Sequence, residues 1–161
     1  MTPKILKIQF LILFIYCFLF IVSSVDAATL YLSPSSQNIY QSNSFIVEIR
    51  INTEGEEINT VGVNLTYSSS LLEMLNVNRG DSILTLWPKE PVIKEGRISF
   101  IGGTPNGFQG EDGLIARLIF RGKGIGKEAV NFEESSRALL NDGLGTESQL
   151  NFLNGNYEII E

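Results

Sequence analysis

The segment INTVGVNLTY, Ile58 to Tyr67, decides the fold of this chain, because it alternates strictly between two kinds of residue. Its hydrophobic positions are Val61, Val63, Leu65 and Tyr67. The positions between them are small or polar, namely Thr60, Gly62, Asn64 and Thr66. A period of two is typical of a β-strand that buries one face and exposes the other. We therefore expect a strand whose outer face is small and polar.

The segments on both sides carry similar short strand patterns. Upstream, SFIVEIRIN at residues 44–52 alternates in the same way. Downstream, we predict strands over residues 82–87, 96–102, 114–120, 129–132 and 150–160. Many short strands separated by glycine, proline and asparagine turns indicate an all-β domain. The fold expected is an antiparallel β-sandwich of jelly-roll topology.

Three segments between these strands break the pattern. SSSLLEML at residues 68–75 predicts a short helical turn with serine at its N-cap. Pro88 and Pro91 exclude a continuous central strand after residue 87, because proline cannot donate a hydrogen bond to a neighbouring strand. GGTPNGFQGEDG at residues 102–113 predicts a turn-rich loop.

The N-terminus predicts a secretory signal. Lys4 and Lys7 precede an unbroken apolar run at residues 10–22, and Val25 and Ala27 occupy the positions where a signal peptidase requires small residues. We expect a signal-peptide helix over residues 1–27, cleaved after Ala27, and a mature domain over residues 28–161. The alternative is an uncleaved membrane anchor, for which the run is shorter than the roughly 20 residues needed. A Sec-type signal implies an extracellular or cell-surface location.

Composition restricts the chemistry of the mature domain. The chain has no histidine, and its one cysteine, Cys17, lies within the predicted signal. Histidine- and cysteine-based catalysis is therefore excluded, and so is a disulfide, which leaves stability to the core. The net charge of −6 and the lack of a basic cluster argue against nucleic acid as a partner.

Adjacent carboxylates do not indicate an enzyme either. The pairs are Glu56/Glu57, Glu111/Asp112 and Glu133/Glu134. A glycosidase holds two carboxyl groups facing each other across a cleft, whereas neighbours in an extended chain point to opposite faces. Asn141-Asp142-Gly143 with Glu147 lacks the spacing of a calcium-binding loop and is typical of a turn. We predict neither a catalytic residue nor a metal site.

Several motifs occur together in an order that resembles the cohesin family. INTVGVNLTYSSSLLEML is similar to the block in which an alternating strand ends in Tyr and leads into a Leu-Glu segment. NRGDSIL, GRISFIGG and DGLIARLIFRGKGIG resemble the strands and turns that follow it. ALLNDGLGT, with LWPKEP and GGTPNGFQG, resembles free-standing bacterial and archaeal cohesin-like proteins. The resemblance covers nearly all of residues 28–161.

This resemblance implies an exported, non-catalytic module that binds a dockerin-like protein, in an assembly linked to polysaccharide degradation. In the family, dockerin lies against one flat sheet face. Here that face would comprise Thr60, Gly62, Asn64, Ile101, Thr104 and Gly107. The chain departs from the family at Gly62, where an acidic residue is usual, and near Thr104, where none is found. No cofactor is required, and calcium is expected on the partner.

Two aromatic residues leave alternatives open. An exposed Trp87 would be a platform for stacking sugars, which would suit a polysaccharide-binding module, whereas a core or rim position would make it structural. Phe108, in the predicted glycine-rich loop, would either anchor a partner or fold back over the end of the sandwich. A structural surface or adhesion protein is the third possible function. Membrane contact is expected only if the signal stays uncleaved.

Overall fold

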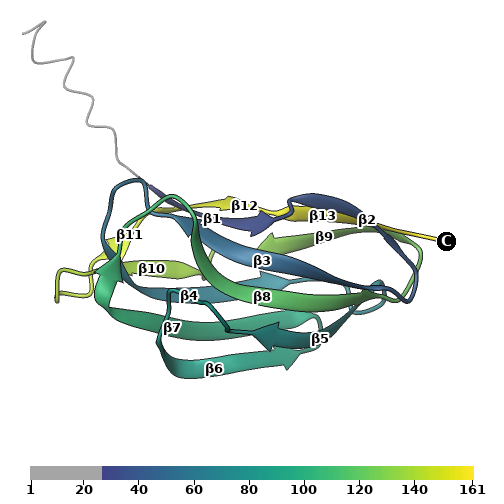
Figure 1. Ribbon diagram of the computed structural model, residues 1–161, viewed down its shortest axis with the longest axis horizontal. Coiled ribbons are helices and arrows are strands. Elements are labelled where there is room, and N and C mark those ends of the chain that lie inside the picture. Colours follow the sequence, from purple (N-terminus) through teal and green to yellow (C-terminus); the bar gives the residue numbers. More distant parts are fainter. Residues whose placement is uncertain (1–26) are drawn as a thin grey trace, which may run out of the picture.

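The computed structural model describes residues 27–161, and these form a sandwich of two β-sheets (Figure 1). Residues 1–26 of the predicted signal peptide lie outside the described residues. In the part of the chain that is described, no helix has the length and hydrophobicity to cross a membrane. The all-β sandwich predicted from the alternating segments is confirmed.

The first sheet has five strands in the order β12-β1-β3-β8-β5. Their bounds are β12 Leu150–Leu153, β1 Ala28–Ser33, β3 Ser44–Asn52, β8 Gly113–Gly122 and β5 Leu72–Asn78. The antiparallel pair β3 and β8 is its centre (Figure 1). β3 has the bounds that its alternation predicted: Phe45, Val47, Ile49 and Ile51 point into the sandwich, whereas Ile46 on the other face is exposed.

The second sheet is built around β4, Ile58–Thr66. One edge of β4 pairs with β7, Arg97–Phe108, and β7 pairs in turn with the edge strand β6, Leu86–Lys94. The other edge of β4 pairs first with β10, Arg137–Leu140, and then with β9, Gly126–Phe132. The sheet continues through β11 Glu147–Ser148 beside β10, and through β13 Gly155–Ile160 and β2 Ser36–Tyr40 beside β9.

Hydrophobic side chains from both sheets fill the space between them. Val61, Val63 and Leu65 of β4 are fully buried, as the alternation predicted. Across the sheets, Phe45 of β3 packs on Tyr157 of β13 with ring centroids 5.5 Å apart. Interdigitated packing of this kind stabilises a domain without a disulfide.

Two strand pairs depart from the antiparallel arrangement expected. β1 pairs with β12 in parallel, and β13 pairs with β2 in parallel. β1 and β2 are separated only by a turn at Ser33-Pro34, which has a cis peptide bond, so the N-terminal segment contributes one strand to each sheet. Parallel pairing needs long connections, and these strands come from opposite ends of the domain.

Four local predictions were wrong. The single strand predicted over residues 150–160 is two strands, β12 and β13, which belong to different sheets. The strand predicted over residues 82–87 lies instead at Leu86–Lys94 and runs through both prolines. It tolerates them because β6 is an edge strand, whose register shifts in each of the two intervals that contain a proline. The predicted loop at residues 102–113 begins later, since β7 continues to Phe108. The helical turn expected at residues 68–75 is a non-helical turn followed by β5.

Candidate functional site

The outer surface of β6, β7, β4 and β10 is the candidate site, and we call it the β4 face. Because Val61, Val63 and Leu65 point into the core, Thr60, Gly62 and Asn64 point away from it. The register places Gly103 of β7 opposite Thr60, Ile101 opposite Gly62, and Ser99 opposite Asn64. Four of the predicted site residues, Thr60, Gly62, Asn64 and Ile101, are therefore neighbours on one surface.

Gly62 lies at the middle of the β4 face, between Ile101 and Arg137, its partners on the two adjacent strands. A Cβ atom at Gly62 would lie 3.4 Å from Cγ of Arg137 and 3.7 Å from Cγ1 of Ile101. These are ordinary van der Waals distances, so the stem of Arg137 lies directly beside Gly62. Nη1 of Arg137 is 3.6 Å from Oε1 of Glu147 on β11. The sequence motif identified Gly62, but it gave no sign that an arginine covers it.

We call Gly62 and Ile101 the central row of this face. An apolar hollow lies beside this central row. Its volume is about 490 Å³, and it is lined by Asn59, Thr60, Leu86, Trp87, Pro88, Gly103, Thr104 and Pro105. Leu86 is 56% exposed, so its side chain is available to a partner at this hollow. Thr60, Trp87 and Thr104 therefore line the same hollow. From the sequence, Trp87 was a candidate for binding a sugar, whereas Thr60 and Thr104 were candidates for binding a protein.

A second, more polar hollow of about 590 Å³ lies on the other side of the central row, around Asn64. The amide Nδ2 of Asn64 donates to the carbonyl of Ser135 at 3.2 Å. At the margin of the hollow, Nη2 of Arg97 is 2.6 Å from Oε1 of Glu133. Asn64 is thus held in one orientation by its own neighbours.

Trp87 occupies a rim position and is not a free stacking platform. Its ring lies 5.5 Å from that of the buried Phe100, at an interplanar angle of 54°. The guanidinium carbon of Arg79 stands 5.0 Å from its centroid, within the range of a cation–π contact. Trp87 is half-buried and closes the core at the β6 edge.

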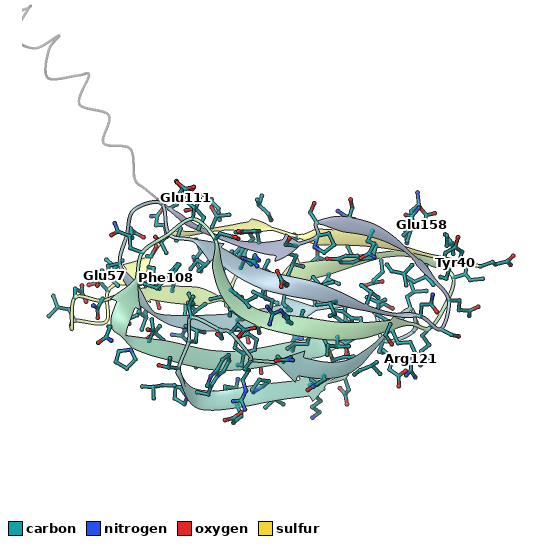
Figure 2. The ribbon with its side chains drawn as sticks, in the orientation of Figure 1. Tyr40, Glu57, Phe108, Glu111, Arg121 and Glu158 are labelled. Atoms are coloured by element: carbon teal, nitrogen blue, oxygen red, sulfur yellow. The ribbon has the colours of Figure 1, made fainter. Side chains whose placement is uncertain are left out.

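Gly107 and Phe108 lie at the end of the sandwich, away from the central row. Figure 2 shows Phe108 and Glu57 at this end. A Cβ atom at Gly107 would lie 2.6 Å from Oε1 of Glu57, so that side chain already covers the glycine. The Phe108 ring folds over Gly113, where a Cβ would lie 2.6 Å from its Cε1 atom. Phe108 was expected either to anchor a partner or to fold back over the end of the sandwich, and its position is the second of these.

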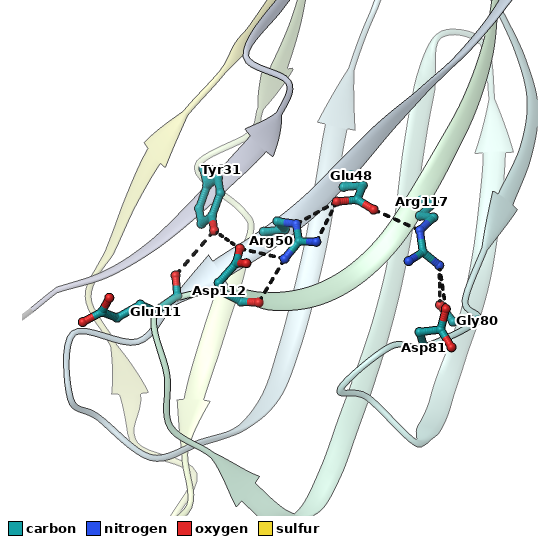
Figure 3. A network of polar contacts seen from close by, with 8 residues as sticks. All are labelled: Tyr31, Glu48, Arg50, Gly80, Asp81, Glu111, Asp112 and Arg117. Atoms are coloured by element: carbon teal, nitrogen blue, oxygen red, sulfur yellow. Dashed lines mark hydrogen bonds and ion pairs between the residues drawn. The ribbon is translucent and has the colours of Figure 1, made fainter.

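The outer face of the first sheet carries a chain of polar contacts (Figure 3). Nε of Arg50 donates to Oε2 of Glu48 at 2.8 Å, and Nε of Arg117 donates to the other carboxylate oxygen at 3.0 Å. Nη1 of Arg50 also lies 2.7 Å from Oδ1 of Asp112, which accepts the hydroxyl of Tyr31 at 2.6 Å. Every charged side chain in this network of contacts has a partner within it, which is typical of a structural surface.

These contacts shift the pKa values of the network. Burial raises the pKa of Glu48, but the hydrogen bonds from Arg50 and Arg117 outweigh it and hold the pKa below its ordinary value. Burial, followed by the hydrogen bond to Asp112, raises the pKa of Tyr31 to about 12. Neither group is tuned toward neutral pH, where an acid–base catalyst would operate.

The carboxylate pairs considered from sequence are engaged separately. Glu56 accepts a hydrogen bond from Ser148, and Glu57 accepts one from Asn141. Asp112 belongs to the network of Figure 3, and Glu133 pairs with Arg97. Within residues 27–161, no group of three or more acidic, histidine or cysteine side chains is arranged to hold a metal ion.

Comparison with solved structures finds the same architecture in several proteins. A non-cellulosomal cohesin from Archaeoglobus fulgidus superposes with a TM-score of 0.70 at 19% identity, covering 84% of this chain and 92% of that one. A type I cohesin from Clostridium thermocellum, solved as a cohesin–dockerin complex, gives 0.69 at 18% identity over 86% and 97%. A type III cohesin from Ruminococcus flavefaciens gives 0.64 at 13% identity over 88% and 92%.

These structures define the class of the fold, a two-sheet sandwich of jelly-roll type. More narrowly, the fold of this chain is that of the cohesin modules, as its ordered motifs predicted. No protein-family model and no curated protein matches the sequence. At identities below 20% in these three comparisons, the likeness establishes the fold, and the function has to be argued from the surface.

Proposed function

We propose that this chain is a non-catalytic binding module whose β4 face docks a dockerin-like protein. The observation that supports this most is the arrangement of Thr60, Gly62, Asn64 and Ile101 on one sheet surface, in a fold whose solved relatives include cohesin–dockerin complexes. Small side chains leave a sheet flat enough for a helix to lie across it, and Ile101 supplies an apolar contact at its centre. Export to the cell exterior and calcium on the partner belong to the same proposal.

The apolar hollow gives this face an anchoring point. Protein interfaces concentrate their binding energy where an apolar or aromatic side chain enters a desolvated pocket. Leu86, Pro88 and Pro105 form such walls, and Gly103 leaves the floor open. Trp87 contributes to the same wall, but Phe100 and Arg79 lie against its ring, which is why we favour a protein over a polysaccharide here.

The test is affinity capture with residues 28–161, which contain the whole sandwich and its core. The bait is exposed to the secreted and cell-associated proteins of the source organism, with and without a calcium chelator, and captured proteins are identified by mass spectrometry. The proposal requires a calcium-dependent partner that contains paired acidic loops of the EF-hand type.

The matched variants are Ile101→Asp on the β4 face and Ile46→Asp on the opposite sheet. Ile46 is 50% exposed on β3 and points away from the core, so its replacement controls for the added charge. Capture should be lost with Ile101→Asp and kept with Ile46→Asp. Equal capture by both variants would place the docking surface elsewhere. Retention on insoluble polysaccharide without any protein partner would refute the proposal.

A further inference from the structure

The β4 face carries a small excess of cations over carboxylates, although the domain as a whole is acidic. The sequence carries a net charge of −6. On the β4 face, by contrast, the outward positions hold four cationic residues, namely Lys89, Lys94, Arg97 and Arg137. Four carboxylates lie nearby: Glu133 and Glu147 pair with the two arginines, Glu90 of β6 pairs with Arg79, and Glu95 lies at the tip of the β6–β7 hairpin.

Lys89 and Lys94 have no such compensation. Both are exposed, and no carboxylate among residues 27–161 forms an ion pair with either of them. A surface that combines uncompensated cations with exposed apolar side chains favours a partner with carboxylates around an apolar contact. Screening at physiological salt limits electrostatic effects to about 8 Å, so the local patch outweighs the distant acidic residues.

The spacing of the cations restricts the shape of that partner. Lys89 is the neighbour of Ile101 on β6, and Arg137 is the neighbour of Gly62 on β10, so the two flank the central row from opposite edges. Four adjacent strands at about 4.8 Å separation put these two positions roughly 14 Å apart. An α-helix has a diameter of about 10–12 Å and fits between them.

Resting on the function proposed above, we propose that the partner segment is an acidic amphipathic helix. It lies along β4 and β7 with its apolar stripe over Ile101 and the Leu86 hollow. Its carboxylates on one flank pair with Lys89, and those on the other flank pair with Arg137, where they compete with Glu147, 3.6 Å from the guanidinium. A face of this charge selects against a basic helix of the same shape, because like charges at the flanks are repelled.

The experiment uses two synthetic helical peptides with the same apolar stripe, one with glutamates and one with lysines on both flanks. Each is titrated into ¹⁵N-labelled residues 28–161, and amide shifts report the affinity and the place of binding. The glutamate peptide should shift amides of β4, β7 and β6 and bind at least about tenfold more tightly than the lysine peptide, as expected for several exposed charge pairs. Raising the salt concentration should weaken that binding.

Charge reversal provides the decisive variants. In the double variant Lys89→Glu with Arg137→Glu, the preference should switch to the lysine peptide. The milder pair Lys89→Gln with Arg137→Gln should merely abolish the preference, and it guards against misfolding of the first variant. Lys127→Glu is the matched control, because Lys127 is exposed on β9 outside the β4 face. It should leave the preference for the glutamate peptide unchanged.

The outcomes separate this inference from the proposed function. Equal binding of both peptides at the β4 face, or tighter binding of the lysine peptide, would overturn the charge preference and leave the docking face in place. Shifts from neither peptide, or shifts confined to other strands, would count against both. Polygalacturonate, an anionic polysaccharide, serves as the third probe: stronger shifts of the same amides by this polymer would overturn the choice of a protein helix.

Discussion

Phe120 is one of the largest fully buried side chains, and its truncation to alanine has a predictable cost. It is fully buried on β8, stacks on Phe45 and meets the ring of Tyr67 edge-on at 5.2 Å, so it joins the two sheets. Removing a buried phenyl ring loses its transfer free energy and leaves a cavity, for a total of about 3–5 kcal/mol. That is a large part of the roughly 5–15 kcal/mol that stabilises a typical domain.

The same loss sets the expected change in melting temperature. An unfolding entropy of about 2.1 cal/mol/K per residue gives roughly 0.28 kcal/mol/K for a domain of this size, so Phe120→Ala should lower Tm by about 10–18 °C. Thermal and urea denaturation followed by circular dichroism measure it. The control is Leu144→Ala, whose side chain is 86% exposed and should change stability by less than about 0.5 kcal/mol. A Phe120→Ala domain with nearly unchanged Tm would refute this account of the core.

Three further predictions concern the packing of β7, the polar network and the single tryptophan. Gly102→Val should destabilise the domain by about 1–3 kcal/mol in urea denaturation, because a Cβ there lies 2.6 Å from Cδ1 of the buried Leu84; an unchanged midpoint would contradict this packing. The lowered pKa of Glu48 means that its contribution to stability is present above its ordinary value of 4.5 and lost as pH falls through the lower folded-state value. Glu48→Gln should therefore reduce Tm at pH 7 and flatten the loss of Tm as pH falls below about 4.5, whereas an unaltered acid profile would show that the network does not act this way. Iodide should quench the fluorescence of the half-buried Trp87 only in part, and binding of the glutamate peptide should reduce the quenching further; unchanged quenching on binding would place the peptide away from the hollow.

The strands and their faces could be predicted wherever the pattern is local. β3 and the core-facing positions of β4 follow from alternation alone, because a period of two reports one buried face whatever strand lies alongside. Predictions failed where a neighbour decides the structure. β6 contains two prolines that would break a central strand, and only its position at the edge, beside β7 alone, makes it a strand.

The site was predictable to a similar extent. The polar outer row of β4 and the place of Ile101 could be predicted, because both are properties of single alternating strands. The surroundings of Gly107 could not, since Glu57, whose side chain covers it, comes from another part of the chain. The same holds for Trp87, whose surroundings depend on Phe100 and Arg79.

The sequence by itself determined that this protein is an all-β domain with a small-residue outer row on one strand, and that histidine and disulfide chemistry are absent after residue 27. These are properties of composition and short-range periodicity. Only the tertiary structure decided that Arg137 lies over Gly62, that Lys89 flanks the same row from the far edge, and that an apolar hollow opens between them and the sandwich end. The physical reason is that the register between strands arises from packing over the whole sandwich, so residues far apart in the chain meet on one face only after the sheets have formed.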